Sequence, residues 1–86
     1  MKKIFVIEDE AAIRESIVEL LEAENFTAMG AEDGNAGVQV AQDYLPDMIL
    51  CDVMMPELDG YGVLHSLRQN PATATIPFIF LTARVS

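Results

Sequence analysis

Three short and nearly uninterrupted apolar runs constrain the fold of this chain more than any other feature of its sequence. They are IFVI (Ile4–Ile7), the run within Met48–Asp52, and IPFIFL (Ile76–Leu81). Apolar runs of this length, rich in β-branched and aromatic residues, are typical of strands buried on both faces of a parallel sheet. Phe26–Ala31 is a shorter and weaker candidate for a further strand. The sequence therefore predicts a buried sheet of four strands.

The segments between these runs carry helical patterns. The first predicted helix ends near Asn25 and has an apolar stripe at i, i+4, i+7 and i+8, made of Ile13, Ile17, Leu20 and Leu21. Asp33 is predicted to cap a second helix that runs to about Tyr44. Asp59 can cap a third helix, which Pro71 would end and whose inner side would carry Val63, Leu64 and Leu67. The order β-α-β-α-β-α-β predicts an α/β fold with helices on both faces of a parallel sheet.

The composition excludes several classes of function. Fourteen acidic residues against five basic ones leave a formal net charge of −9, and such a surface repels nucleic-acid phosphates and anionic lipids. No segment approaches the roughly 20 apolar residues that span a bilayer, and Ile4–Ile7 is too short for a signal-peptide core. The single cysteine, Cys51, has no internal disulfide partner. We therefore expect a cytoplasmic protein, without direct nucleic-acid or membrane binding, in which Cys51 is a buried and unreactive thiol.

Polar residues follow three of the predicted strands. Glu8 and Asp9 come after the first strand, Asp52 ends the third, and Thr82 follows the fourth. In open parallel sheets, ligands bind outside the carboxyl ends of the strands where the strand order reverses, and strands one and three flank that point in a common doubly wound order. We therefore expect Asp9 and Asp52 to be neighbours in space.

Neighbouring carboxylates need a partner. Two of them about 4 Å apart repel by roughly 4 kcal/mol at an effective dielectric constant of 20. A proton or a cation relieves that repulsion, and Mg²⁺ suits one or two carboxylates while keeping waters that a phosphate can replace. The alternative for Glu8 and Glu10, each considered alone, is a solvated acid or a helix cap. Asp52 is a weaker candidate for a cap, because Asp59 is better placed before the third helix.

The stretches VIEDE, DMILCDVMMPELDG and IPFIFLTA together resemble the receiver domain of bacterial two-component response regulators. Each motif alone is weak, but their joint order and spacing are specific, and the resemblance runs from Lys2 to Ala83. It implies a flavodoxin-like (CheY-like), doubly wound parallel sheet, including the strand order.

The resemblance also implies roles for individual residues. Asp52 would be the phosphoryl acceptor, Asp9 a direct Mg²⁺ ligand, and Glu8 a ligand through water. The backbone carbonyl of Met54 would complete the protein ligands, and Mn²⁺ could replace Mg²⁺. A second group of positions would shape the site: the hydroxyl switch Thr82, the small neighbour Ala83, and the loop residues Pro56 and Gly60.

The function implied by this resemblance is that of a phosphoacceptor. A sensor histidine kinase or phosphotransfer protein would supply the phosphoryl group, and the domain would promote only its own phosphorylation and dephosphorylation. The first helix would dock the partner near Ala12, Ile13 and Ser16, although Ile13 fits a core position equally well. The single domain, residues 1–86, would be truncated at its C-terminus.

That truncation would remove the last strand and two helices of the family, together with a lysine that pairs with the acceptor and an aromatic residue coupled to the threonine. Lys2 and Lys3 lie at the wrong end of the first strand to replace that lysine, and nothing supports Arg84 as a substitute. The fourth strand would become a sheet edge. We therefore expect self-association, as a homodimer or by exchange of elements.

Two other readings compete with a working receiver. A pseudo-receiver would bind partners without being phosphorylated. A haloacid-dehalogenase-type phosphatase would also use a strand-end aspartate and Mg²⁺, but Met54 stands where that class has a second, proton-transferring aspartate. An EF-hand is excluded, because the alternating oxygen ligands of its loop do not follow Asp52.

Overall fold

The predicted alternation of strands and helices is confirmed in a computed structural model, which describes residues 1–81. Its elements, in chain order, are β1 (Lys3–Ile7), α1 (Ala11–Ala23), β2 (Thr27–Ala31), α2 (Gly34–Tyr44), β3 (Met48–Cys51), α3 (Gly60–Gln69) and β4 (Phe78–Phe80). None of the helices within residues 1–81 is long and apolar enough to cross a bilayer.

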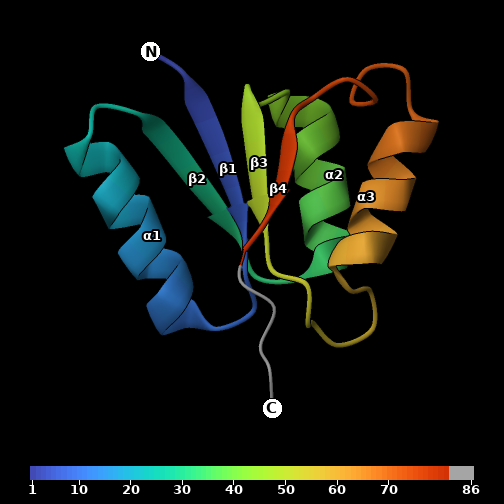
Figure 1. Ribbon diagram of the computed structural model, residues 1–86, viewed down its shortest axis with the longest axis horizontal. Coiled ribbons are helices and arrows are strands. Elements are labelled where there is room, and N and C mark those ends of the chain that lie inside the picture. Colours follow the sequence, from blue (N-terminus) through green and yellow to red (C-terminus); the bar gives the residue numbers. More distant parts are fainter. Residues whose placement is uncertain (82–86) are drawn as a thin grey trace.

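The four strands form one parallel sheet in the order β2-β1-β3-β4. The chain moves outward from β1 to β2 and then crosses back to β3, so the strand order reverses between β1 and β3. Helix α1 covers one face of the sheet, and α2 and α3 cover the other (Figure 1). This is the predicted doubly wound arrangement, and it places its switch point where β1 and β3 end.

Most of the core lies between the sheet and the α2–α3 layer. Phe5 and Ile7 of β1 and Ile49 and Cys51 of β3 are fully buried there, together with Ala41, Val63 and Leu67 from the two helices. Asp33 and Asp59 cap these helices as predicted, because their carboxylates accept the N–H groups of Ala36 (2.7 Å) and Gly62 (2.9 Å), respectively.

The apolar stripe predicted for the first helix is only partly correct. Ile13 and Leu20 are 39% and 66% exposed, and no residue of α1 is fully buried. Helix α1 packs over β2 and β1, and within residues 1–81 no second helix lies beside it on that face (Figure 1). Of the four stripe residues, only Ile17 and Leu21 are half-buried.

The fourth strand is shorter than the predicted Ile76–Leu81. The N–H of Ile76 donates to the carbonyl of Thr73 (3.2 Å), so Ile76 closes a turn although its side chain is buried. Pro77 follows and has no N–H to donate to a sheet. The regular strand therefore begins at Phe78. The other strand boundaries differ from the predictions by one residue.

Candidate functional site

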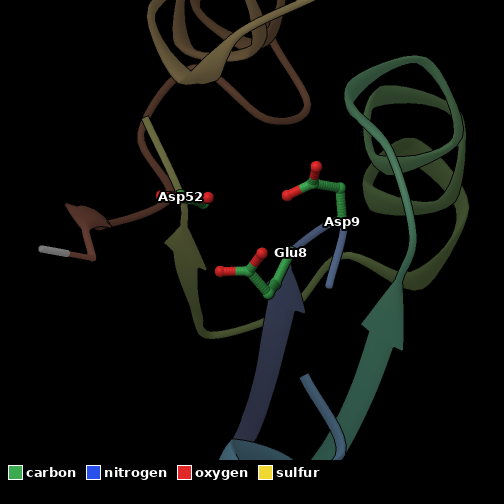
Figure 2. Close-up of side chains that lie close together, drawn as sticks. All are labelled: Glu8, Asp9 and Asp52. Atoms are coloured by element: carbon green, nitrogen blue, oxygen red, sulfur yellow. The ribbon is translucent and has the colours of Figure 1, made fainter. Parts of the chain in front are cut away.

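The predicted meeting of Asp9 and Asp52 is confirmed, and Glu8 joins them. One carboxylate oxygen from each of these residues lies within 4.8 Å of the other two. Figure 2 shows the three side chains converging beyond the ends of β1 and β3. Glu8 and Asp52 are only 3% and 1% exposed, and Asp9 is half-buried. Three acids from two separate segments therefore share one small, largely buried space.

Backbone hydrogen bonds hold these acids at the strand ends. The N–H of Asp52 donates to the carbonyl of Ile7 (2.9 Å), and the N–H of Glu8 donates to that of Ala31 (3.1 Å). The ladders of the sheet thus continue one residue beyond β3 and β1. The backbones of Glu8 and Asp52 are therefore held by the sheet rather than by a free loop.

The electrostatics of the cluster disfavour its fully ionised form. Burial raises the pKa of Glu8 to about 6, and a hydrogen bond with Asp9 and the charges of Asp52 and Asp9 act in the same direction. The N–H of Glu10 donates to the Glu8 carboxylate (2.9 Å) and partly opposes this shift. A cation among the three acids would relieve their repulsion. Their hard oxygen donors fit Mg²⁺.

The loop after Asp52 packs back against it. The N–H of Gly60 donates to the carbonyl of Val53 (2.9 Å), and that of Leu58 donates to Pro56 (2.8 Å). Glu57 has a φ of 67°, whereas Gly60 does not have a positive φ. Gly60 instead allows close approach, because a Cβ there would collide with the carbonyl oxygen of Asp52. The close packing at position 60, and not an unusual backbone conformation, therefore requires a glycine there.

Cys51 is the last residue of β3 and directly precedes Asp52. Its thiol is fully buried, as predicted, and donates to the carbonyl of Asp52 (3.3 Å). Burial raises the pKa of Cys51 to about 12, with a further contribution from the negative charge of Asp52. The thiol therefore stays neutral, which makes it a poor nucleophile.

Several predicted residues lie outside the cluster. Met54 is 57% exposed in the β3–α3 loop. Ala12, Ile13 and Ser16 are exposed on α1, so the core alternative for Ile13 is wrong. Thr82, Ala83 and Arg84 lie outside the described residues.

Arg14 is a neighbour of the site that the sequence reasoning missed. Its Nη1 donates to the carbonyl oxygen of Glu8 (2.8 Å). Arg14 is the one basic residue between Glu8 and Glu24, and that isolation within an acidic segment was the available signal.

A doubly wound parallel sheet with an acidic cluster at its switch point defines a flavodoxin-like α/β protein of the CheY-like type. The sequence profile of the family described as "Response regulator receiver domain" matches residues 4–86. The chain belongs to the response regulator receiver domain family.

Individual relatives agree with this assignment. The chain is 37% identical over 83 residues to the DNA-binding dual master transcriptional regulator RpaA of Synechocystis sp., covering 96% of this chain and 34% of that protein. The curated relatives it matches are thus about three times as long as this chain.

Solved receiver structures share the fold. The N-terminal domain of a response regulator receiver protein from Methanoculleus marisnigri superposes with a TM-score of 0.93 at 31% identity, covering 98% of this chain and 68% of that one. The receiver domain of the sensor histidine kinase PA1611 from Pseudomonas aeruginosa superposes with a TM-score of 0.90 at 29% identity. This match covers 96% of this chain and 68% of that one. That second domain was solved with a magnesium ion coordinated in its active-site cleft.

Proposed function

We propose that this chain is a phosphoacceptor module of two-component signalling, phosphorylated on Asp52 with the help of Mg²⁺. The observation that carries this proposal is the convergence of Glu8, Asp9 and Asp52 within 4.8 Å at the switch point of a receiver fold. A cluster of three acids in which two are almost fully buried is unfavourable in its fully ionised form without a cation. Membership of the receiver family supports the same role.

In this proposal Asp9 and Asp52 bind Mg²⁺ directly, Glu8 binds it through water, and the Met54 carbonyl completes the protein ligands. Mn²⁺ is an acceptable substitute. The bound ion supplies positive charge that offsets the charge developing on the transferred phosphoryl group.

The chain's own chemistry is nucleophilic. A carboxylate oxygen of Asp52 attacks the phosphorus of a phosphohistidine, a P–O bond forms, and the P–N bond to the histidine breaks. The backbone hydrogen bond from Asp52 to Ile7 (2.9 Å) keeps this carboxylate at the end of β3. The phosphoryl group stays on the domain itself, which promotes only its own phosphorylation and dephosphorylation.

The donor in this proposal is a sensor histidine kinase or a phosphotransfer protein in the cytoplasm. The exposed side chains of Ala12, Ile13 and Ser16 on α1 offer the docking surface. Thr82 and Ala83 respond to the phosphoryl group, Thr82 by hydrogen bonding and Ala83 by leaving room for its oxygens. Pro56 and Gly60 keep the β3–α3 loop close to Asp52.

One experiment separates this function from its rivals. The chain is incubated with Mg²⁺ and a small phosphodonor, and its intact mass is measured. We expect a mass increase of one phosphoryl group that disappears in Asp52→Ala. A chain that binds Mg²⁺ without gaining mass would be a pseudo-receiver. Steady consumption of a phosphate ester, without the mass increase, would indicate a phosphatase.

A further inference from the structure

A hydrogen bond from α1 reaches the peptide that joins two of the three acids. The guanidinium of Arg14 donates through Nη1 to the carbonyl oxygen of Glu8 (2.8 Å), and that carbonyl belongs to the Glu8–Asp9 peptide. The N–H of Glu8 donates to the carbonyl of Ala31 (3.1 Å). Glu8 is therefore held on one side by strand β2 and on the other by α1.

The neighbouring strand leaves room for this arginine. Gly30 of β2 lies beside Val6 in the sheet, and a Cβ at Gly30 would lie 2.9 Å from both Cγ and Cδ of Arg14. The aliphatic part of the arginine thus crosses β2 at a position without a side chain. Any larger residue at position 30 would push the stem of Arg14 away from its present path.

A second arginine provides an internal comparison. Arg68 of α3 also donates to backbone carbonyls, those of Ile76 (3.0 Å) and Thr73 (3.3 Å). These carbonyls lie in the segment before β4, at the amino ends of the strands, whereas Glu8 lies at a carboxyl end. The two arginines therefore make the same kind of bond at opposite ends of the sheet, and only the bond of Arg14 is to a residue of the acidic cluster.

We propose that Arg14 is a positioning residue of the metal site. Its bond to the Glu8 carbonyl fixes the Glu8–Asp9 peptide, so that both carboxylates face Asp52 before an ion arrives. The inference rests on the proposed function, because it assumes that this cluster binds Mg²⁺. Hydrogen-bonding partners that orient metal ligands change metal affinity by about 10- to 100-fold when they are removed.

The test is Mg²⁺ binding to the unphosphorylated chain, measured by isothermal titration calorimetry. Arg14→Met keeps the apolar stem and removes the donor, and we expect it to weaken Mg²⁺ binding by about tenfold. Arg68→Met is the matched control, because it removes the same charge and the same kind of bond. Both variants should lower the melting temperature of the metal-free chain, and only Arg14→Met should change the affinity by more than about twofold.

The variant Gly30→Ala tests whether the position of the Arg14 side chain matters apart from its charge. It keeps the guanidinium but displaces its stem, so we expect weaker Mg²⁺ binding than in the wild type. In an Arg14→Met background, Gly30→Ala should leave the affinity unchanged, since the bond that it disturbs is already absent. A Gly30→Ala chain with wild-type affinity, or an equal loss in both backgrounds, would overturn positioning through this contact.

The outcomes distinguish this inference from the proposed function. If the wild-type chain fails to bind Mg²⁺, the metal site itself is wrong and the role of Arg14 falls with it. If the wild type binds Mg²⁺ and Arg14→Met matches Arg68→Met in affinity, only the positioning role is wrong.

Discussion

Gly60, the first residue of α3, lies against the carbonyl oxygen of Asp52, so closely that a Cβ at position 60 would collide with it. The same Cβ would approach the Cα of Val53 to 3.0 Å and Cε1 of Phe80 to 3.1 Å. Two of these three atoms belong to the backbone and cannot rotate away. The start of α3 is therefore packed directly onto the residue proposed to accept the phosphoryl group.

This contact predicts that Gly60→Ala destabilises the chain by about 1–3 kcal/mol, the usual range for overpacking. It should also slow phosphorylation from a small phosphodonor, because Asp52 must shift. Gly62→Ala is the matched control in the same helix. Its Cβ would meet the movable end of the Leu58 side chain, and alanine is favoured in helices. Chemical denaturation measures both variants, and equal losses of stability would contradict the packing argument.

Removing one negative charge from the cluster should have opposite effects with and without metal. In EDTA, Asp52→Asn should raise the free energy of unfolding by about 1–2 kcal/mol, because it relieves repulsion among buried carboxylates. It should also weaken Mg²⁺ binding at least about tenfold. Asp43→Asn, at an exposed position of α2, makes the same charge change and should do neither. An unchanged Mg²⁺ affinity in Asp52→Asn would refute the metal site.

The raised pKa of Glu8 predicts a pH dependence of stability. Its pKa is about 6 in the folded chain against an ordinary value of 4.5, so the folded state binds the proton more tightly. Stability from this group is fully present below pH 4.5 and is lost as the pH rises through about 6. The loss amounts to about 2 kcal/mol.

Glu8→Gln isolates this contribution from that of the other acids. Denaturation of the metal-free wild type and variant from pH 4 to pH 8 gives the difference between their stabilities at each pH. We expect the wild type to lose stability relative to Glu8→Gln across the interval from 4.5 to about 6. A difference that stays constant over that interval would show that Glu8 has an ordinary pKa in the folded chain.

The β4 edge predicts self-association of the 86-residue chain. Strand β4 pairs with β3 on one side, and no other strand within residues 1–81 pairs with its outer side. Ile79 in its middle is 48% exposed. Light scattering should detect dimers or larger species, and Ile79→Lys should reduce them, since a charge on an edge strand disfavours pairing.

Leu45→Lys serves as the control for this edge, because Leu45 is similarly exposed (47%) but lies at the C-terminal end of α2. It should leave the association unchanged. A clean monomer at high protein concentration would defeat the prediction for the unmodified chain.

Local patterns in the sequence predicted the order of the elements, the two aspartate caps, and the acids at the strand ends. These features depend on residues close together in the chain: apolar spacing sets strand or helix, and a cap bonds to an amide three residues away. The same reasoning misjudged the stripe on α1, because the exposure of Ile13 and Leu20 depends on which elements lie beside that helix.

The sequence by itself thus determined the alternation of elements and the presence of carboxylates where strands end. The sequence, with the general rule for doubly wound sheets, also predicted that Asp9 and Asp52 are neighbours. Only the tertiary structure decided that oxygens of Glu8, Asp9 and Asp52 lie within 4.8 Å of one another, that Glu8 is buried enough to raise its pKa, and that Arg14 reaches the Glu8 carbonyl across Gly30. Each of these depends on the strand order and on packing between segments far apart in the chain. Distances and burial of that kind follow from the assembled sheet, which no local pattern encodes.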